Sequence, residues 1–230
     1  MSRNRVVEAA IDQLKRVATK ATRDGMARFG IPNDKALGVT VGDIRKIAKE
    51  LGRNHDLALA LWKTVVYEAR ILACFVADPK TVTPKQMDSW AKDFDNWAIC
   101  DTACFHLFDR TPHAFAKIVK WAKSRDEFVK RGAFALLASV ALHDKKAVNA
   151  SFIKCLPLIA KAAIDDRNFV KKGVSWALRG IGKRNATLRV AAIALAEQLA
   201  RSENSSARWI GKDTLRDLAK SKKKSRPKVN

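Results

Sequence analysis

A short stretch of the chain, Phe128-Val129-Lys130-Arg131-Gly132, returns after 41 residues as Phe169-Val170-Lys171-Lys172-Gly173. A second stretch, Leu-Arg-Gly-Ile at 178–181, returns after 37 residues as Leu-Arg-Asp-Leu at 215–218. Self-similarity at a fixed period of this length is typical of proteins built by stacking one supersecondary unit. The two pairs therefore predict a repeat of about forty residues, with two helices in each unit.

The rest of the sequence carries the same helical period. Apolar residues recur three and four apart, as at Leu188, Ala191, Ala192, Leu195 and Leu199, and no sustained alternation marks a strand. We predict an all-α fold, a HEAT-like helical repeat solenoid of about six helical pairs without a β-sheet. The second helices line the concave side, and the Lys/Arg-rich segments 128–132, 169–173 and 206–216 make that groove basic.

The charge balance predicts an anionic partner. Lys and Arg number 45 against 23 Asp and Glu, which gives a net charge of +22 in 230 residues. Residues 220–230 hold six cations and no acid, but the remainder still carries +16, so the tail alone does not explain the charge. Binding of a polyanion explains this magnitude better than a solubilising surface does. We predict one domain over residues 1–219, followed by a basic disordered tail at 220–230.

Several classes of protein are excluded by what the sequence lacks. Its apolar runs are too short to span a bilayer, and no signal-peptide pattern follows the basic N-terminus. We expect a cytoplasmic, nucleoid-associated monomer with no membrane partner. Phosphate-loop, zinc-protease and dinucleotide motifs are absent, so no cofactor is expected. No CxxC pair occurs, so no metal site is expected and the four cysteines are predicted to be buried core thiols: Cys74, Cys100, Cys104 and Cys155.

Two charged residues stand out in apolar helices. Asp101 lies one turn from Trp97 on the same face of a helix that begins near Asn96. A lone carboxylate there needs either a structural cation or a functional reason, and the two interpretations are equally good. Arg131 poses the same question. It forms a salt bridge, with Asp101 as one candidate partner, or it clamps a phosphate at the groove wall.

Trp176 lies among cations. Its helix has a core stripe elsewhere, whereas Trp176 shares a face with Lys172, Arg179 and Lys183. A large aromatic side chain among cations favours a nucleic-acid contact over packing against the next repeat. Other tryptophans sit in ordinary helical stripes, and we predict that they pack between repeats: Trp62, Trp90, Trp121 and Trp209.

Residues 178–186 also resemble the hairpin of helix-hairpin-helix DNA-binding proteins. A glycine cap between two repeat helices explains Gly180 and Gly182 as well. The glycosylases built on that hairpin place an aspartate after it, and none occurs between Gly182 and Asp213. The repeat interpretation is therefore preferred.

From about Met26 to Lys220 the chain resembles the AlkD-type DNA glycosylases, the HEAT-like-repeat DNA alkylation repair family. The resemblance rests on an ordered set of short motifs: Gly38-Val39-Thr40-Val41 with Arg45, Trp97 with Asp101, Lys130-Arg131-Gly132-Ala133, and Phe169-Val170-Lys171-Lys172 with Trp176-Ala177-Leu178-Arg179. It implies that Trp97, Asp101, Arg131 and Trp176 line the groove at the lesion as catalytic residues. The chain departs from the best-known type at Phe29, Gly42, Asn96 and Ala98.

The resemblance implies a glycosylase that hydrolyses the N-glycosidic bond of 7-methylguanine and 3-methyladenine in double-stranded DNA containing alkylated bases. The DNA-binding residues are then Thr40, Arg45, Lys130, Lys171, Lys172, Arg179, Lys183, Arg208 and Lys212. Two alternatives stay open: a non-catalytic HEAT-repeat protein that binds bent, damaged or branched DNA, and a scaffold for an acidic protein.

Overall fold

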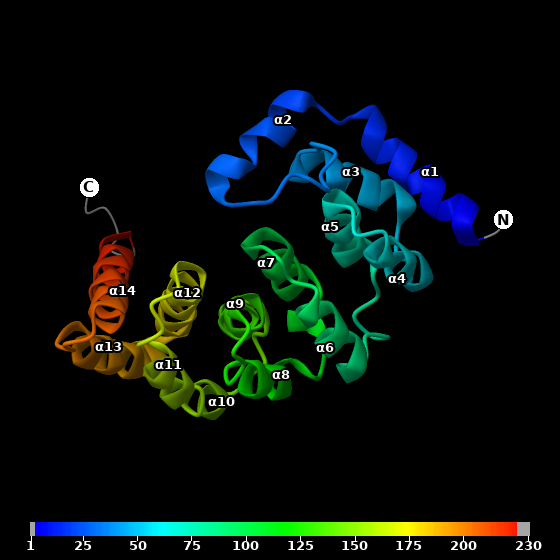
Figure 1. The fold of residues 1–230 in the computed structure, drawn as a ribbon. Coiled ribbons are helices and arrows are strands. Elements are labelled where there is room, and N and C mark those ends of the chain that lie inside the picture. The colour runs from blue at the N-terminus through cyan, green and yellow to red at the C-terminus, as the bar shows by residue number, and fades with distance from the viewer. Residues whose placement is uncertain (1–2, 225–230) are drawn as a thin grey trace, which may run out of the picture. The chain divides into compact units, whose positions relative to one another are not determined.

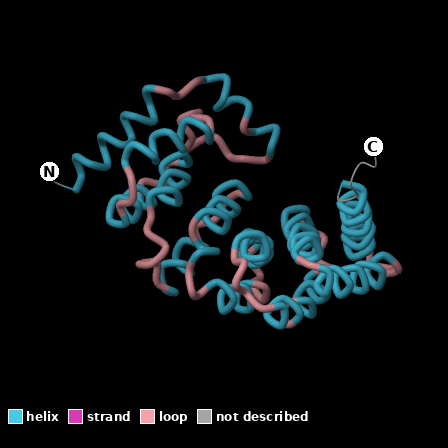
Figure 2. The backbone as a smooth tube through the Cα atoms, turned by 180° about the vertical axis from the view of Figure 1, so that it is seen from behind, coloured by secondary structure: helices cyan, strands magenta, loops and turns pink. Residues whose placement is uncertain are grey.

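Helices make up the secondary structure of the chain in the computed structural model, which describes residues 3–224 and contains no strand in that range (Figures 1 and 2). In chain order they are α1 (Arg3–Arg16), α2 (Lys20–Gly25), the 3-10 turn η1 (Ala27–Phe29), α3 (Val41–Leu51), α4 (His55–Lys63), α5 (Tyr67–Val76), α6 (Pro84–Lys92), α7 (Trp97–His106), the 3-10 turn η2 (Phe108–Arg110), α8 (Ala114–Trp121), α9 (Glu127–His143), α10 (Asn149–Ile153), α11 (Leu156–Ala162), α12 (Asn168–Arg184), α13 (Ala186–Ala200) and α14 (Ser205–Lys224). The predicted all-α class is confirmed.

The helices fall into two compact units, Met1–Thr111 and Pro112–Asn230. In the first unit α3 packs on α5 and α5 packs on α7, while α4 pairs with α5. In the second unit α9, α12 and α14 pack side by side, and α8, α11 and α13 each pair with one of them (Figure 1). This is the helix-pair stacking of a repeat solenoid, as predicted. The prediction of a single domain, and of one basic concave groove, stays a prediction.

The sequence repeat corresponds to equivalent positions in two stacked helices. Residues 128–132 form the start of α9, and residues 169–173 form the start of α12. Their first aromatic residues meet, because the rings of Phe128 and Phe169 lie 5.3 Å apart between centroids. Contact between these two half-buried rings, together with burial of both apolar stripes, holds one repeat on the next.

The two glycines of residues 178–186 serve helix packing, and α12 runs without a break from Asn168 to Arg184. A Cβ on Gly182 would lie 2.7 Å from Leu218 Cδ1, and one on Gly180 would lie 3.4 Å from Ala138 Cα. A side chain at Gly182 would displace the Leu218 side chain of α14, whereas one at Gly180 would meet α9 at about ordinary contact distance. Both the hairpin and the glycine cap are therefore wrong, since Gly180 and Gly182 lie inside a continuous helix.

The first residues of the predicted disordered tail belong to a helix. Helix α14 continues to Lys224, so residues 220–224 are helical and the prediction of disorder is wrong for them. Lysine loses little side-chain freedom in a helix, and the next proline is Pro227, so nothing stops the helix earlier. Residues 225–230 of the predicted tail lie outside the described residues. No described helix combines the length and apolar character needed to cross a membrane.

The tryptophans predicted to pack between repeats do so with one exception. Trp62 and Trp90 stack at 3.9 Å between ring centroids with planes 4° apart, and Trp121 is buried. Trp209 is 38% exposed, so its assignment to packing is wrong.

Candidate functional site

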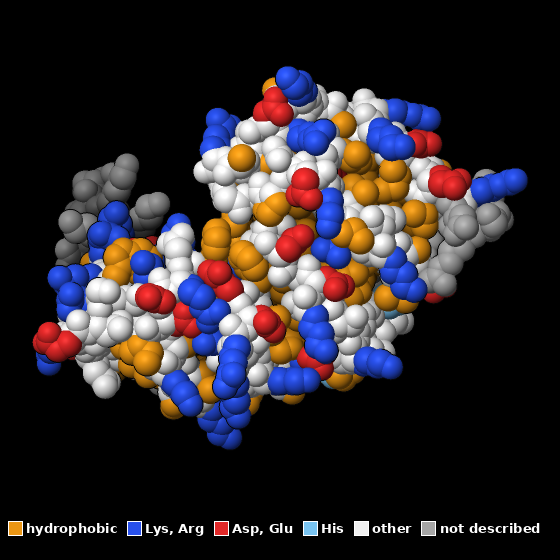
Figure 3. Space-filling view, viewed as in Figure 1, with side chains coloured by type: hydrophobic (Ala, Val, Ile, Leu, Met, Phe, Trp, Pro, Cys, Tyr) orange, Lys and Arg blue, Asp and Glu red, His pale blue; other side chains and the backbone are white. Residues whose placement is uncertain are grey.

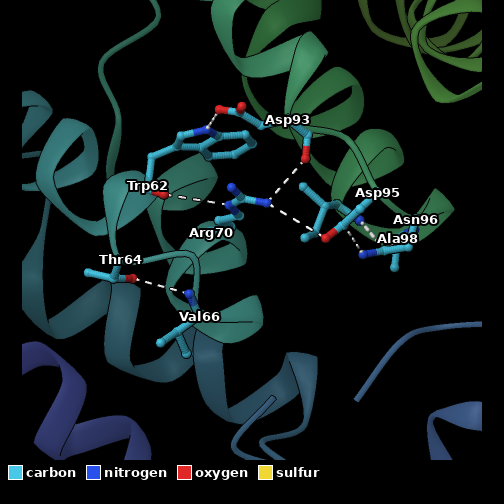
Figure 4. A network of polar contacts seen from close by, with 9 residues as sticks. Trp62, Thr64, Val66, Arg70, Asp93, Asp95, Asn96 and Ala98 are labelled. Carbon is cyan, nitrogen blue, oxygen red and sulfur yellow. Dashed lines mark hydrogen bonds and ion pairs between the residues drawn. The ribbon is translucent and has the colours of Figure 1, made fainter. Parts of the chain in front are cut away.

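The start of α7 is fixed by a polar network. The Asn96 side chain caps the helix by accepting hydrogen bonds from the backbone N–H groups of Ala98 (2.9 Å) and Ile99 (3.0 Å). Just before it, buried Arg70 of α5 donates to the Asp93 carbonyl oxygen at 3.1 Å (Figure 4). The Asp93 carboxylate accepts a 2.8 Å bond from Trp62 Nε1. These bonds set where α7 begins and how it is rotated.

Helix α7 presents Trp97 and Asp101 on one face. Both are half-buried, whereas Ala98, Ile99 and Cys100 between them are buried. Trp97 Nε1 donates a 2.9 Å hydrogen bond to the carbonyl oxygen of Phe29. Because the indole has a single donor, this bond fixes the ring and leaves its π face for a ligand.

The loop before α3 is held by a buried carboxylate. Glu68 of α5 is fully buried and accepts hydrogen bonds from the backbone N–H groups of Leu37 (2.8 Å), Gly38 (2.7 Å) and Val39 (3.1 Å). Gly38 has φ +95°, and a Cβ there would lie 2.3 Å from the Thr19 carbonyl oxygen. Only glycine fits this turn. The Gly38-Val39-Thr40 motif is therefore a structural device that delivers the chain to α3.

Thr40 and Arg45 occupy different positions on α3. Thr40 caps the helix, and its hydroxyl accepts from Asp43 N at 3.2 Å and donates to Asp43 Oδ2 at 2.8 Å. Arg45 is exposed, and its Nη2 lies 3.1 Å from His106 Nε2 at the end of α7. Its guanidinium also lies 5.5 Å from the centroid of the Phe75 ring. The structure thus brings Arg45 beside the helix that carries Trp97 and Asp101.

Arg131, in the second unit, is 6% exposed. Its Nη1 donates a 2.7 Å hydrogen bond to the carbonyl oxygen of Phe169, and its guanidinium lies 6.0 Å from that ring. A Cβ on Gly173 would touch Arg131 Cγ at 3.5 Å. Trp176, half-buried, follows Gly173 by three residues, so it continues along the same side of α12. Arg131 and Trp176 therefore lie on neighbouring helices of one unit.

Lys130 belongs to an ion-pair network at the start of α9. Its Nζ lies 2.9 Å from Asp165 Oδ2, and Arg167 binds the same carboxylate through Nε (2.9 Å) and Nη2 (2.7 Å). Arg167 Nη1 also donates to the Arg125 carbonyl oxygen at 2.7 Å. Hydrogen bonds from Arg167, and then Lys130, hold the pKa of Asp165 well below its usual range against the opposing effect of burial. The network joins the loop before α12 to the start of α9.

Replacing Asp165 by asparagine is expected to destabilise the protein by about 1–3 kcal/mol at pH 7, because charge-assisted hydrogen bonds are lost. The folded pKa of Asp165 lies below the unfolded value, so its contribution is complete above about pH 4 and is lost as the pH falls further. Urea unfolding at pH 7, 5 and 3 measures the difference from wild type. The difference is expected to be equal at pH 7 and 5 and smaller at pH 3. A difference independent of pH down to 3 would show that the charge of Asp165 plays no part.

Arg179 and Lys183 are held by carboxylates of α14. Arg179 lies 3.6 Å from Asp213 Oδ2 and 3.8 Å from Asp217 Oδ1, and Lys183 Nζ lies 2.6 Å from Asp217 Oδ2. Burial opposes ionisation of Asp213, but hydrogen bonds from Ser175 and Arg216 outweigh it, so its pKa is lowered. Both predicted DNA contacts therefore also join α12 to α14.

The remaining predicted DNA contacts of the second unit differ in how exposed their side chains are. Lys172 and Lys212 are exposed. Lys171 is half-buried and places Nζ 5.2 Å from the centroid of the Trp209 ring. Arg208 is half-buried, and its Nη1 donates to the carbonyl oxygens of Ser202 (2.8 Å) and Glu203 (3.1 Å), which closes the turn between α13 and α14.

The structure thus groups the predicted residues within each unit. Trp97, Asp101 and Arg45 gather on α7 and α3, while Arg131 and Trp176 lie on α9 and α12. Lys and Arg side chains are spread over the face seen in Figure 3, with Asp and Glu among them. That the two groups share one surface stays a prediction, because they belong to different units.

The four cysteines are buried and unpaired as disulfides, which confirms their prediction as core thiols. Burial raises the pKa of the Cys155 thiol to about 11. A thiol that stays protonated at neutral pH is a poor nucleophile and a poor metal ligand.

The chain is similar to known proteins in sequence and in fold. The family model described as DNA alkylation repair enzyme matches residues 10–218. A solved structure, described as a new family of proteins related to the HEAT-like repeat DNA glycosylases with affinity for branched DNA structures, is 18% identical. The match covers 91% of this chain and 94% of that one, with a TM-score of 0.75. A designed armadillo repeat protein is 15% identical over 78% of this chain and 70% of that chain, with a TM-score of 0.34. No curated protein sequence matches.

Proposed function

Because this chain belongs to the DNA alkylation repair enzyme family, we propose that it hydrolyses the N-glycosidic bond of cationic alkylated purines, 7-methylguanine and 3-methyladenine, in duplex DNA. The supporting observation is the face of α7. Trp97 and Asp101 lie one turn apart, both half-buried, on a helix whose other side is apolar core. An indole face and a carboxylate are thereby fixed side by side at the surface of the first unit.

This pair suits a leaving group that already carries positive charge. A purine alkylated at nitrogen 7 or 3 departs without protonation, so no general acid is needed. The developing sugar cation is stabilised by a nearby carboxylate, the role that carboxylates play in glycosidases. Asp101 supplies that charge and orients the attacking water. The π face of Trp97, with its N–H held by Phe29, favours the cationic sugar.

Unit 2 contributes phosphate contacts and a second aromatic. Lys172 and Lys212 are exposed cations on α12 and α14 that suit backbone phosphates. Trp176 lies on the side of α12 that Arg131 contacts, where its ring would offer DNA an aromatic contact on this unit. For Arg131, which donates to the Phe169 carbonyl oxygen, we keep the role of a phosphate contact as part of the proposal.

A second candidate function is binding of branched DNA without base release. It is favoured by the solved structure of similar fold, which is described as having affinity for branched DNA structures. The exposed lysines on α12 and α14, Lys172 and Lys212, serve this function equally well. Binding alone assigns no role to the carboxylate of Asp101 on the face of α7.

Base release separates the two functions. Wild-type protein is incubated with a duplex carrying 7-methylguanine and, in parallel, with a duplex carrying uracil, a neutral base that leaves as an anion and so needs stabilisation that a cationic base does not. We expect release of 7-methylguanine above spontaneous loss and none of uracil. Binding of both duplexes with release of neither supports the second candidate instead.

A further inference from the structure

Trp209 is an exposed aromatic residue to which no role has been given. It lies in the first two turns of α14 and is 38% exposed. An exposed indole costs free energy in water, since its large apolar surface stays hydrated. It lies within one unit with α12, so its neighbours on that helix are defined.

The surroundings of Trp209 are cationic. Lys171 Nζ lies 5.2 Å from the ring centroid, and exposed Lys212 follows Trp209 by three residues on the same face of α14. The nearest acid on that face, Asp213, has its charge balanced by Arg216 at 2.6 Å and by Arg179 at 3.6 Å. The local field around the ring is therefore positive.

We propose that Trp209 is a stacking site for an unpaired nucleotide, with Lys171 and Lys212 binding the flanking phosphates of the same single strand. An aromatic face beside cations is the composition of single-strand binding sites, where a base stacks on the ring and the charges follow the backbone. In an intact duplex each base is already stacked on its neighbours, so the ring has no base face to bind. The site therefore selects DNA that carries a single-stranded arm. The proposal rests on the proposed DNA-binding function and specifies its substrate class.

Two DNA probes test the site: a blunt duplex, and the same duplex extended by an arm of about ten thymidines. Trp209→Ala is expected to weaken binding of the armed duplex about 5- to 100-fold and that of the blunt duplex less than about twofold, because each base stack contributes on that scale. Trp209→Phe is expected to retain most of the affinity. Val190→Ala, at a residue of α13 in the same unit that is 71% exposed, is the matched control and is expected to change neither affinity.

Fluorescence gives an independent measurement. Free oligothymidine is expected to quench the indole emission of the wild type, and Trp209→Phe is expected to abolish most of that quenching while the protein still binds. Equal weakening of both duplexes by Trp209→Ala, or unchanged quenching in Trp209→Phe, would overturn the proposal. A wild type that releases 7-methylguanine but shows no preference for the arm overturns this proposal alone. A wild type that prefers the armed duplex but releases no base overturns only the proposed glycosylase activity.

Discussion

Asp101→Asn is expected to slow the release of 7-methylguanine about a hundredfold while the duplex affinity stays within about twofold. The substitution keeps the volume and hydrogen-bonding shape of the side chain and removes its charge. One preorganised electrostatic group contributes about 3–4 kcal/mol to a barrier, or about a hundred- to a thousandfold in rate. Because the leaving group already carries positive charge, we expect the loss of rate to lie at the low end of this range. Affinity comes mainly from Lys and Arg contacts to phosphate, which the change leaves intact.

Three measurements on this variant separate catalysis from structure: the melting temperature, the duplex affinity and the single-turnover release of 7-methylguanine. Asp24→Asn makes the same change in charge at an exposed residue of the first unit and is expected to match wild type in all three. If Asp101 serves as a structural partner of a buried cation, its substitution lowers the melting temperature and the affinity together. A stable, DNA-binding Asp101→Asn protein that releases base at the wild-type rate would exclude a catalytic Asp101.

Glu68→Gln is expected to lower the free energy of unfolding by about 3–5 kcal/mol. Glutamine keeps one acceptor oxygen for the N–H groups of Gly38 and Val39, whose bonds lose their charge assistance, and turns an amide donor toward Leu37 N–H. One charge-assisted bond of about 1.5–3 kcal/mol is therefore lost, and the unsatisfied Leu37 N–H costs about 1–3 kcal/mol more. The site is fully buried, so water does not replace them. Urea unfolding measures the change.

Glu50→Gln, on the exposed side of α3, is the matched control and is expected to stay within about 0.5 kcal/mol of wild type. Hydrogen exchange locates the effect of Glu68→Gln. The amides of residues 37–39 and of the first turn of α3 are expected to exchange faster than in wild type. Stability within 1 kcal/mol of wild type, or unchanged exchange in that loop, would contradict the role assigned to Glu68.

The fold followed from the sequence because its repeat is physically local. Phe128 and Phe169 recur at one period since each opens the second helix of a unit and meets its counterpart in the neighbour. On α12 the apolar residues that recur three and four apart, Val170, Val174 and Ala177, are fully buried. Such patterns depend only on helix geometry and on the burial of apolar surface. Both can be inferred from the spacing of apolar residues in one sequence.

The polar framework could not be predicted in the same way. Glu68 binds a loop about thirty residues earlier through backbone N–H groups, which leave no mark in the sequence. Arg179 and Lys183 were identified as DNA contacts from one helix alone, whereas their carboxylate partners lie a full repeat later on α14. Asn96 did carry a signal, since an asparagine directly before an apolar helix is a typical N-cap.

The central claim is that this chain breaks the N-glycosidic bond of a cationic purine, and a single-turnover time course tests it most directly. Excess protein is mixed with a duplex carrying one 7-methylguanine, and free base is followed beside the same DNA without protein. A rate that exceeds spontaneous loss, rises with protein concentration and saturates is the predicted result. A rate equal to that of DNA alone, at a protein concentration that binds all the duplex, would contradict the claim.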